Sequence, residues 1–214
     1  MLNFIEYTLL KPEATQLDYE AHIETGLLSG AFGICIPPYW VKMAHRNLPK
    51  SASTKIVTVA GFPFGYQKTN VKLADVAQSI EDGANEIDIV MNVSAFRTGM
   101  HIWVKPELAQ AAELCHVSGV LLKVIIETGY LSKEEIVTAS KICMDSGADF
   151  VKTSTGYAPN GASVENIKLI KSVVSNYCGI KASGGIKTRK FASELIEAGA
   201  DRIGTSTNPA EFRS

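Results

Sequence analysis

The sequence predicts a closed barrel of eight parallel strands, a (β/α)8 fold formed by residues 1–214 as a single domain. About eight short β-branched runs alternate with helical patterns, and no hairpin signal joins two strands. Four helices end in Gly-Ala directly before a strand, at Gly30, Gly83, Gly147 and Gly199, as a repeated unit would. The competing architecture is an open doubly wound sheet, but the glycine-rich dinucleotide fingerprint is missing after the first strand.

The first half of the chain is assigned from end signals and periodicity. Residues 5–10 alternate like a strand, and Thr15-x-x-Asp18 resembles a capping box that opens a helix ending at Gly30. Two prolines stop the next strand, and two glycines follow the third. Helical spacing of apolar residues ends near Gly83. The resulting strands are 5–10, 31–36, 55–60 and 86–91, and the helices are 16–29, 38–47 and 69–83.

The second half continues the alternation. Residues 92–105 are expected as loop or short helix, with Pro106 opening the next helix at its first position. Ser132-x-x-Glu135 predicts another capping box, and Ser163 another N-cap. The resulting strands are 121–127, 149–154, 178–182 and 201–205, and the helices are 106–118, 132–146, 164–176 and 188–198.

Composition and charge exclude several classes of function. A formal net charge of −1 offers no footprint for nucleic acid, and no apolar run approaches the roughly 20 residues of a membrane span. The first residues lack the features of a secretory signal. The four cysteines lie far apart, so we expect reduced thiols in a cytoplasmic protein. The four histidines show no ligand spacing, which predicts no metal site.

Charged residues in the middle of buried strands are expected to meet inside the barrel. Because successive side chains of a strand point to opposite faces, each of these charges stands opposite an apolar face that can pack on helices. The charged residues concerned are Asp88, Lys123, Lys152 and Lys181. Lys123 and Glu127 share a face in the predicted strand, so a structural ion network stays open as an alternative for that pair.

Two buried lysines beside one obvious carboxylate predict covalent chemistry. Desolvation favours the neutral form of an amine, and a neutral amine is what a Schiff-base nucleophile requires. If Lys152 and Lys181 share Asp88, one ammonium is poorly compensated. We therefore predict an amine nucleophile, with Asp88 moving protons directly or through water. A purely structural buried ion pair is the alternative.

Small residues lie at the C-terminal ends of the last three predicted strands. Loops at this end of a (β/α)8 barrel commonly hold a phosphate group on backbone N–H groups. A tight turn explains any one cluster, but three on successive strands favour a phosphorylated small-molecule substrate. The residues concerned are Thr155, Gly156, Gly184, Gly185, Gly204, Thr205 and Ser206.

Six segments, running in order across nearly the whole chain, resemble the deoxyribose-phosphate aldolases, a family of class I aldolases. The lysine strand with its Thr-Ser-Thr-Gly tail is a specific motif. The matching segments are residues 7–12, 59–65, 86–90, 122–129, 150–156 and 180–188.

The resemblance implies reversible cleavage of 2-deoxy-D-ribose 5-phosphate to D-glyceraldehyde 3-phosphate and acetaldehyde. Lys152 matches the Schiff-base lysine, Lys181 the second lysine that keeps the first deprotonated, and Asp88 the acidic partner in proton transfer. Thr8 and Lys123 are expected in supporting positions. The resemblance implies no metal or organic cofactor, and a homodimer.

Some positions depart from the family pattern. Glu6 stands where Asp is usual, a change that could alter a proton relay with Lys181, and Tyr7 stands where His is frequent. Tyr157 stands where many members carry a basic residue that helps to bind phosphate. Some members have a tail that ends in tyrosine, and the last four residues of this sequence do not match it. Two alternatives stay open: a Schiff-base aldolase for another phosphorylated sugar, and a non-catalytic phosphosugar-binding barrel.

Overall fold

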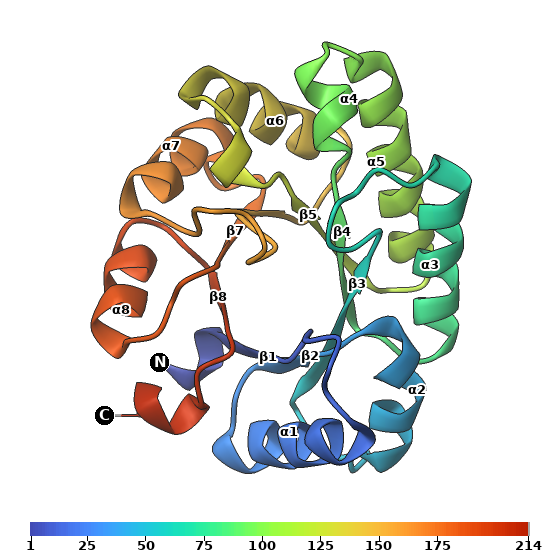
Figure 1. The fold of residues 1–214 in the computed structure, drawn as a ribbon, viewed down its shortest axis with the longest axis vertical. Coiled ribbons are helices and arrows are strands. Elements are labelled where there is room, and N and C mark those ends of the chain that lie inside the picture. The colour runs from blue at the N-terminus through green and yellow to red at the C-terminus, as the bar shows by residue number, and fades with distance from the viewer. Residues whose placement is uncertain (214) are drawn as a thin grey trace.

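The computed structural model describes residues 1–213 and confirms the predicted closed barrel. The eight strands are parallel and pair in chain order, and β8 pairs back with β1 (Figure 1). The strands are β1 (Ile5–Thr8), β2 (Gly33–Cys35), β3 (Lys55–Ala60), β4 (Glu86–Val90), β5 (Leu121–Ile125), β6 (Phe150–Lys152), β7 (Gly179–Ser183) and β8 (Arg202–Thr205).

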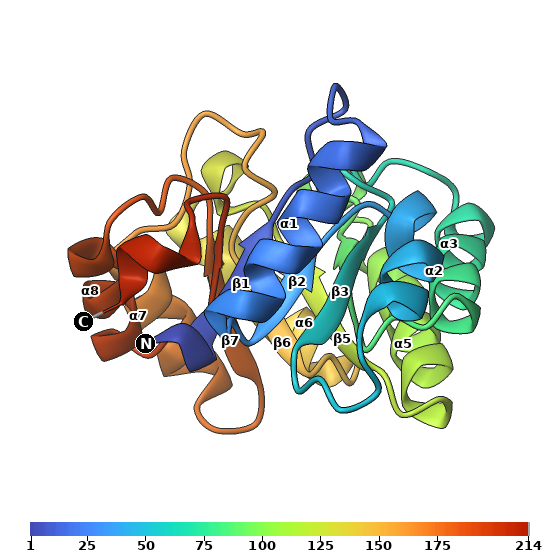
Figure 2. The same ribbon diagram turned by 90° about the horizontal axis from the view of Figure 1, so that it is seen from below.

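Helices surround the barrel on all sides (Figures 1 and 2). They are α1 (Gln16–Ser29), α2 (Pro38–Asn47), α3 (Thr69–Glu81), α4 (Val93–Arg97), α5 (His101–Val117), α6 (Lys133–Asp145), α7 (Val164–Val174) and α8 (Arg189–Glu197). The capping boxes at Thr15 and Ser132 and the N-cap at Ser163 are confirmed. Within residues 1–213, no helix has the length and apolar character needed to cross a membrane.

The prediction that Pro106 opens a helix is wrong. Helix α5 begins at His101, and Pro106 lies inside it. A proline cannot donate to the carbonyl four residues earlier, here that of Ile102. Ile102 is 76% exposed, so water can reach this part of the helix. Burial of the apolar face of α5 against the barrel outweighs the one missing hydrogen bond.

The residue after the repeated Gly-Ala pair gives the repeat a structural explanation. At three of the four places the next residue is Asn or Asp, and its side chain accepts a hydrogen bond from an N–H of the preceding strand. Asn85 accepts from Ile56 at 2.8 Å. Asp149 accepts from Leu122 at 2.7 Å, and Asp201 accepts from Ile180 at 2.9 Å. At these three places the repeat therefore joins the helix end to the neighbouring strand.

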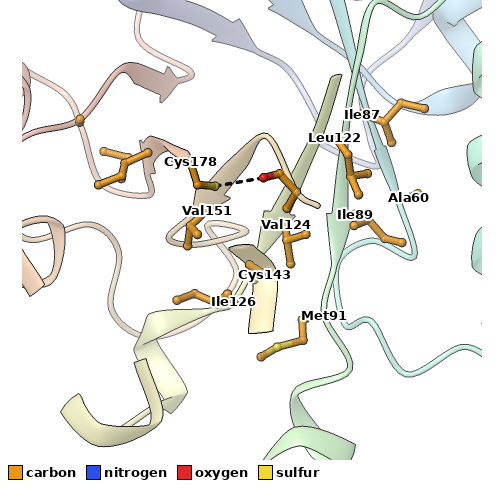
Figure 3. Packing of buried hydrophobic residues seen from close by; sticks show 14 of the residues in the cluster. Ala60, Ile87, Ile89, Met91, Leu122, Val124, Ile126, Cys143, Val151 and Cys178 are labelled. Carbon is orange, nitrogen blue, oxygen red and sulfur yellow. Dashed lines mark hydrogen bonds between the residues drawn. The ribbon is translucent and has the colours of Figure 1, made fainter. Parts of the chain in front are cut away.

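The two faces of the strands separate apolar from charged residues. Outward-facing residues such as Ile87, Ile89, Leu122, Val124 and Val151 are fully buried in the hydrophobic core that also contains the inner faces of the helices (Figure 3). This packing holds the strands in register. The charged residues of the same strands point into the barrel, where they form the site described below.

A buried ion pair fixes the helices behind β4. Lys72 of α3 is fully buried, and its Nζ donates to the carbonyl of Val90 at 2.8 Å and to Glu107 of α5 at 2.7 Å. Glu107 also accepts from the hydroxyl of Thr69 at 2.9 Å. The pair therefore ties α3 and α5 to the end of the strand that carries Asp88.

The substitution Lys72→Met is expected to lower the free energy of unfolding by about 3–5 kcal/mol, because Glu107 is left buried without its cation. Urea denaturation measures this loss. Lys42→Met is the matched control, since Lys42 is 70% exposed and its Nζ lies 3.6 Å from Asp82. Its expected cost is below about 1 kcal/mol. Equal costs for the two variants would contradict the prediction.

Candidate active site

Asp88 of β4 is the centre of a buried charge cluster inside the barrel. Its Oδ1 accepts from Lys123 of β5 at 3.0 Å. Its Oδ2 accepts from Lys152 of β6 at 2.7 Å and from Lys181 of β7 at 2.6 Å. Lys152 is 3% exposed, and the other three residues are fully buried. The structure therefore brings together the four charged residues that alternation predicted inside the barrel.

The expectation of a single obvious carboxylate for the lysines is wrong, because Glu6 and Glu86 also belong to the cluster. Glu6 of β1 forms an ion pair with Lys181 and lies 3.6 Å from Lys123, while Glu86 lies 2.5 Å from Lys123. Glu86 precedes Asp88 by two residues on the same strand. The period of two would have placed it inside the barrel as well.

The surroundings of the two candidate catalytic lysines shift their pKa values in opposite directions. Burial lowers the pKa of Lys152, and the nearby charge of Lys181 lowers it further, so the net shift is downward although Asp88 raises the pKa. Burial also opposes the charge of Lys181, but Asp88 and Glu6 together raise its pKa above the ordinary value. Burial favours protonation of Asp88, yet the three lysines hold its pKa well below the usual range.

Glu127 does not join the charge cluster. Strand β5 ends at Ile125, and Glu127 has a left-handed φ of 56°, so the alternation of faces does not extend to it. Its carboxylate instead accepts from the N–H of Thr155 at 3.2 Å and from the Thr155 hydroxyl. Burial raises the pKa of Glu127. The predicted shared face of Lys123 and Glu127 is therefore wrong.

A cavity of about 460 Å³ opens at the carboxyl ends of the strands, and Lys152 is part of its wall. Thr8, expected in a supporting position, lines the same cavity. All the small residues predicted to bind phosphate lie there too: Thr155, Gly156, Gly184, Gly185, Gly204, Thr205 and Ser206.

Backbone N–H groups at the ends of β7 and β8 are suited to an anion. Gly184 and Gly185 have φ of 91° and 77°, values that glycine adopts without a steric penalty. The N–H groups of Gly184, Gly185 and Ser206 donate to no acceptor within residues 1–213. Free amides in such a turn can bind phosphate oxygens.

Three of the predicted phosphate-binding residues have other contacts in the structure. A Cβ on Gly204 would lie 3.0 Å from Cε of Lys181, so this glycine makes room for the lysine. The N–H and hydroxyl of Thr155 donate to Glu127. The hydroxyl of Thr205 donates to the carbonyl of Ile186 at 2.6 Å.

Two cavity-lining lysines were missed by the sequence interpretation. Lys11 lies in the loop after β1, and Lys187 lies in the loop after β7. Both side chains are exposed, and both belong to the wall that carries the glycines. Lys187 follows Gly185 by two residues, and this spacing from the predicted phosphate loop was the available signal.

Comparison with known proteins agrees with this geometry. The sequence profile described as "DeoC/LacD family aldolase" matches residues 7–208. A deoxyribose-phosphate aldolase of Thermococcus gammatolerans is 42% identical over 205 residues, which cover 95% of this chain and 91% of that protein. One from Clostridium botulinum (strain Kyoto / Type A2) is 44% identical over 203 residues, covering 95% of this chain and 94% of that protein.

Solved structures give the same result. The aldolase QR15 superposes with a TM-score of 0.93 at 40% identity, covering 98% of this chain and 93% of that one. The deoxyribose phosphate aldolase of Aeropyrum pernix, described as a tetramer, gives a TM-score of 0.90 at 29% identity, covering 99% of this chain and 88% of that one. The chain belongs to the DeoC/LacD family of aldolases.

Proposed function

We propose that this protein reversibly cleaves 2-deoxy-D-ribose 5-phosphate to D-glyceraldehyde 3-phosphate and acetaldehyde through a Schiff base on Lys152. The observation that carries the proposal is an amine with a lowered pKa in the wall of a cavity where the loops after the next two strands present free backbone N–H groups. Relatives that are 42–44% identical over nearly the whole chain carry the same activity in their names.

The proposed cycle begins when neutral Lys152 attacks the C1 carbonyl of the open-chain sugar and water is lost. The C3 hydroxyl then gives up its proton while the C2–C3 bond breaks, and the electron pair moves to the protonated imine. This step releases glyceraldehyde 3-phosphate and leaves an enamine on Lys152. Protonation of the enamine at C2 and hydrolysis of the imine release acetaldehyde and restore the amine.

Asp88 and Lys181 are assigned the proton transfers in this cycle. The Oδ2 atom of Asp88 is within 2.7 Å of the Nζ of Lys152 and within 2.6 Å of the Nζ of Lys181. A carboxylate held between a neutral amine and a charged one can accept and return a proton. Lys123 and Thr8 support the arrangement, Lys123 through its hydrogen bond to Asp88.

Cleavage of 2-deoxy-D-ribose 5-phosphate by the purified protein tests the proposal. Acetaldehyde release is followed by its reduction in a coupled assay, with the unphosphorylated sugar as the comparison substrate. We expect a higher kcat/KM for the phosphorylated sugar. Folded protein that releases no acetaldehyde from it would contradict the proposed function.

The substitution Lys187→Gln is expected to raise KM for the phosphorylated sugar about tenfold. A charge-assisted contact contributes roughly 1.5–3 kcal/mol to binding, and solvent around this exposed side chain reduces that contribution. The KM for unphosphorylated deoxyribose is expected to stay the same. Lys190→Gln is the control, because Lys190 is also exposed but lies on α8. An equal change in KM for both sugars would remove Lys187 from the phosphate site.

We also propose a homodimer in the cytoplasm. Exposed apolar side chains support the dimer: Tyr66, before α3, and Ile102 and Trp103, in the first turn of α5, are 66%, 76% and 70% exposed, and Tyr66 and Trp103 line the same surface cavity. Light scattering after gel filtration tests the dimer, and a wild-type monomer at micromolar concentration would contradict it.

Four free, buried cysteines support a location in the cytoplasm, and recovery of the protein outside the cytosolic fraction would contradict that location.

A further inference from the structure

Hydrogen bonds from both the side chain and the backbone hold Tyr157 at the mouth of the cavity. Its hydroxyl donates to the carbonyl of Leu10, in the loop after β1, at 3.2 Å. Its backbone N–H donates to the hydroxyl oxygen of Thr155 at 3.1 Å. Its ring stands edge-on to Phe62, in the loop after β3, with the ring centroids 5.6 Å apart. Loops from three parts of the barrel therefore meet at this side chain.

The main chain before Tyr157 is fixed by Glu127, a buried carboxylate that the proposed cycle does not use. Glu127 is 4% exposed and accepts from both the N–H and the hydroxyl of Thr155. Because the same Thr155 hydroxyl accepts from Tyr157, the three residues form one hydrogen-bonded chain. Tyr157 is thus positioned by the fold before any substrate enters.

A second, smaller cavity of about 50 Å³ lies on the other side of Tyr157. It is lined mainly by apolar and aromatic side chains, namely Pro63, Phe64, Val90, Val93, Tyr130 and Ala158. Within residues 1–213, Thr155 and Tyr157 are the residues that line both cavities. The side chain of Thr155 is turned to Glu127, which leaves Tyr157 as the residue at the boundary of the two spaces whose side chain is large.

We propose that Tyr157 is a specificity-determining residue, whose side chain closes the active site off from this apolar cavity and so denies the apolar group of an acceptor aldehyde the contacts it would make there. The proposal rests on the proposed function, taken in the direction of aldol addition. There the enamine carbon on Lys152 bonds to the carbonyl carbon of the acceptor aldehyde, whose oxygen takes up a proton, and water then hydrolyses the imine. The apolar cavity, of about 50 Å³, can take up an aromatic ring only if the space that Tyr157 occupies is opened.

The test compares two acceptors for acetaldehyde, glyceraldehyde 3-phosphate and benzaldehyde, in the wild type, Tyr157→Ala and Tyr157→Phe. We expect Tyr157→Ala to raise the ratio of kcat/KM for benzaldehyde to that for glyceraldehyde 3-phosphate at least about tenfold, within the range of hydrophobic pocket discrimination. Tyr157→Phe loses the bond to Leu10 and keeps the ring, so its ratio should stay within about twofold of the wild type.

Two results would overturn the proposal in folded protein: an unchanged ratio in Tyr157→Ala, or an equal shift in both variants. If the wild type adds acetaldehyde to neither acceptor, the proposed function fails instead. Borohydride trapping of phenylacetaldehyde on Lys152 then decides the role of Tyr157 separately. More adduct in Tyr157→Ala than in the wild type and Tyr157→Phe supports the role, and equal adduct in all three removes it.

Discussion

Replacing Lys152 with alanine is expected to lower kcat/KM for 2-deoxy-D-ribose 5-phosphate by a factor on the order of 10⁴ or more, as the loss of a covalent nucleophile does. The second candidate lysine of the buried cluster is not suited to replace it. The Nζ of Lys181 is buried between Glu6 and Asp88, which raise its pKa and keep it charged, so it cannot attack a carbonyl.

Borohydride trapping with acetaldehyde, followed by peptide mass spectrometry, measures the nucleophile directly. Wild-type protein should carry one reduced two-carbon adduct on Lys152, and Lys152→Ala should carry none. Lys133→Ala is the control, because Lys133 is 67% exposed and pairs with Glu165 on the surface. An adduct on Lys181 would reverse the assigned roles of the two lysines. No adduct in folded wild-type protein would favour the non-catalytic phosphosugar-binding barrel.

The substitution Asp88→Asn is expected to have the second largest effect, lowering kcat by about 10²–10⁴-fold through the loss of proton transfer. It also leaves three buried lysines with two carboxylates, so we expect the free energy of unfolding to fall by about 3–5 kcal/mol. Because the native fold lowers the pKa of Asp88, this contribution is present above the unfolded carboxyl pKa and is lost as the pH falls through the folded one.

The pH profile separates proton transfer from a general loss of structure. Asp88 raises the pKa of Lys152 in the wild type, so its removal should lower that pKa and move the acid limb of kcat/KM to lower pH. Asp145→Asn is the control, because Asp145 is 52% exposed and pairs with Lys105 at 3.1 Å. Its profile should match the wild type. An acid limb at the wild-type pH in Asp88→Asn would contradict the assigned coupling.

The sequence alone determined the barrel and the residues at its centre. Period-two alternation in strands with one apolar face forces Asp88, Lys123, Lys152 and Lys181 to the inner side, whatever the details of packing. The repeated helix ends show glycine after the helix and, at three of the four, Asn or Asp before the strand, with a side chain that bonds to the strand 21–29 residues earlier. Such signals are written in a few adjacent residues and can be read without coordinates.

The tertiary structure decided how the charges balance and where each strand stops. The pairing of Glu6 with Lys181 joins residues 175 positions apart, and no local pattern reports such a contact. Glu127 was misplaced because its left-handed backbone ends the alternation, and its carboxylate binds Thr155, 28 residues away in the sequence. Tyr157 likewise gains its position from Leu10, Phe62 and Thr155, on loops that only the closed barrel brings together, because contacts between distant segments depend on the whole fold.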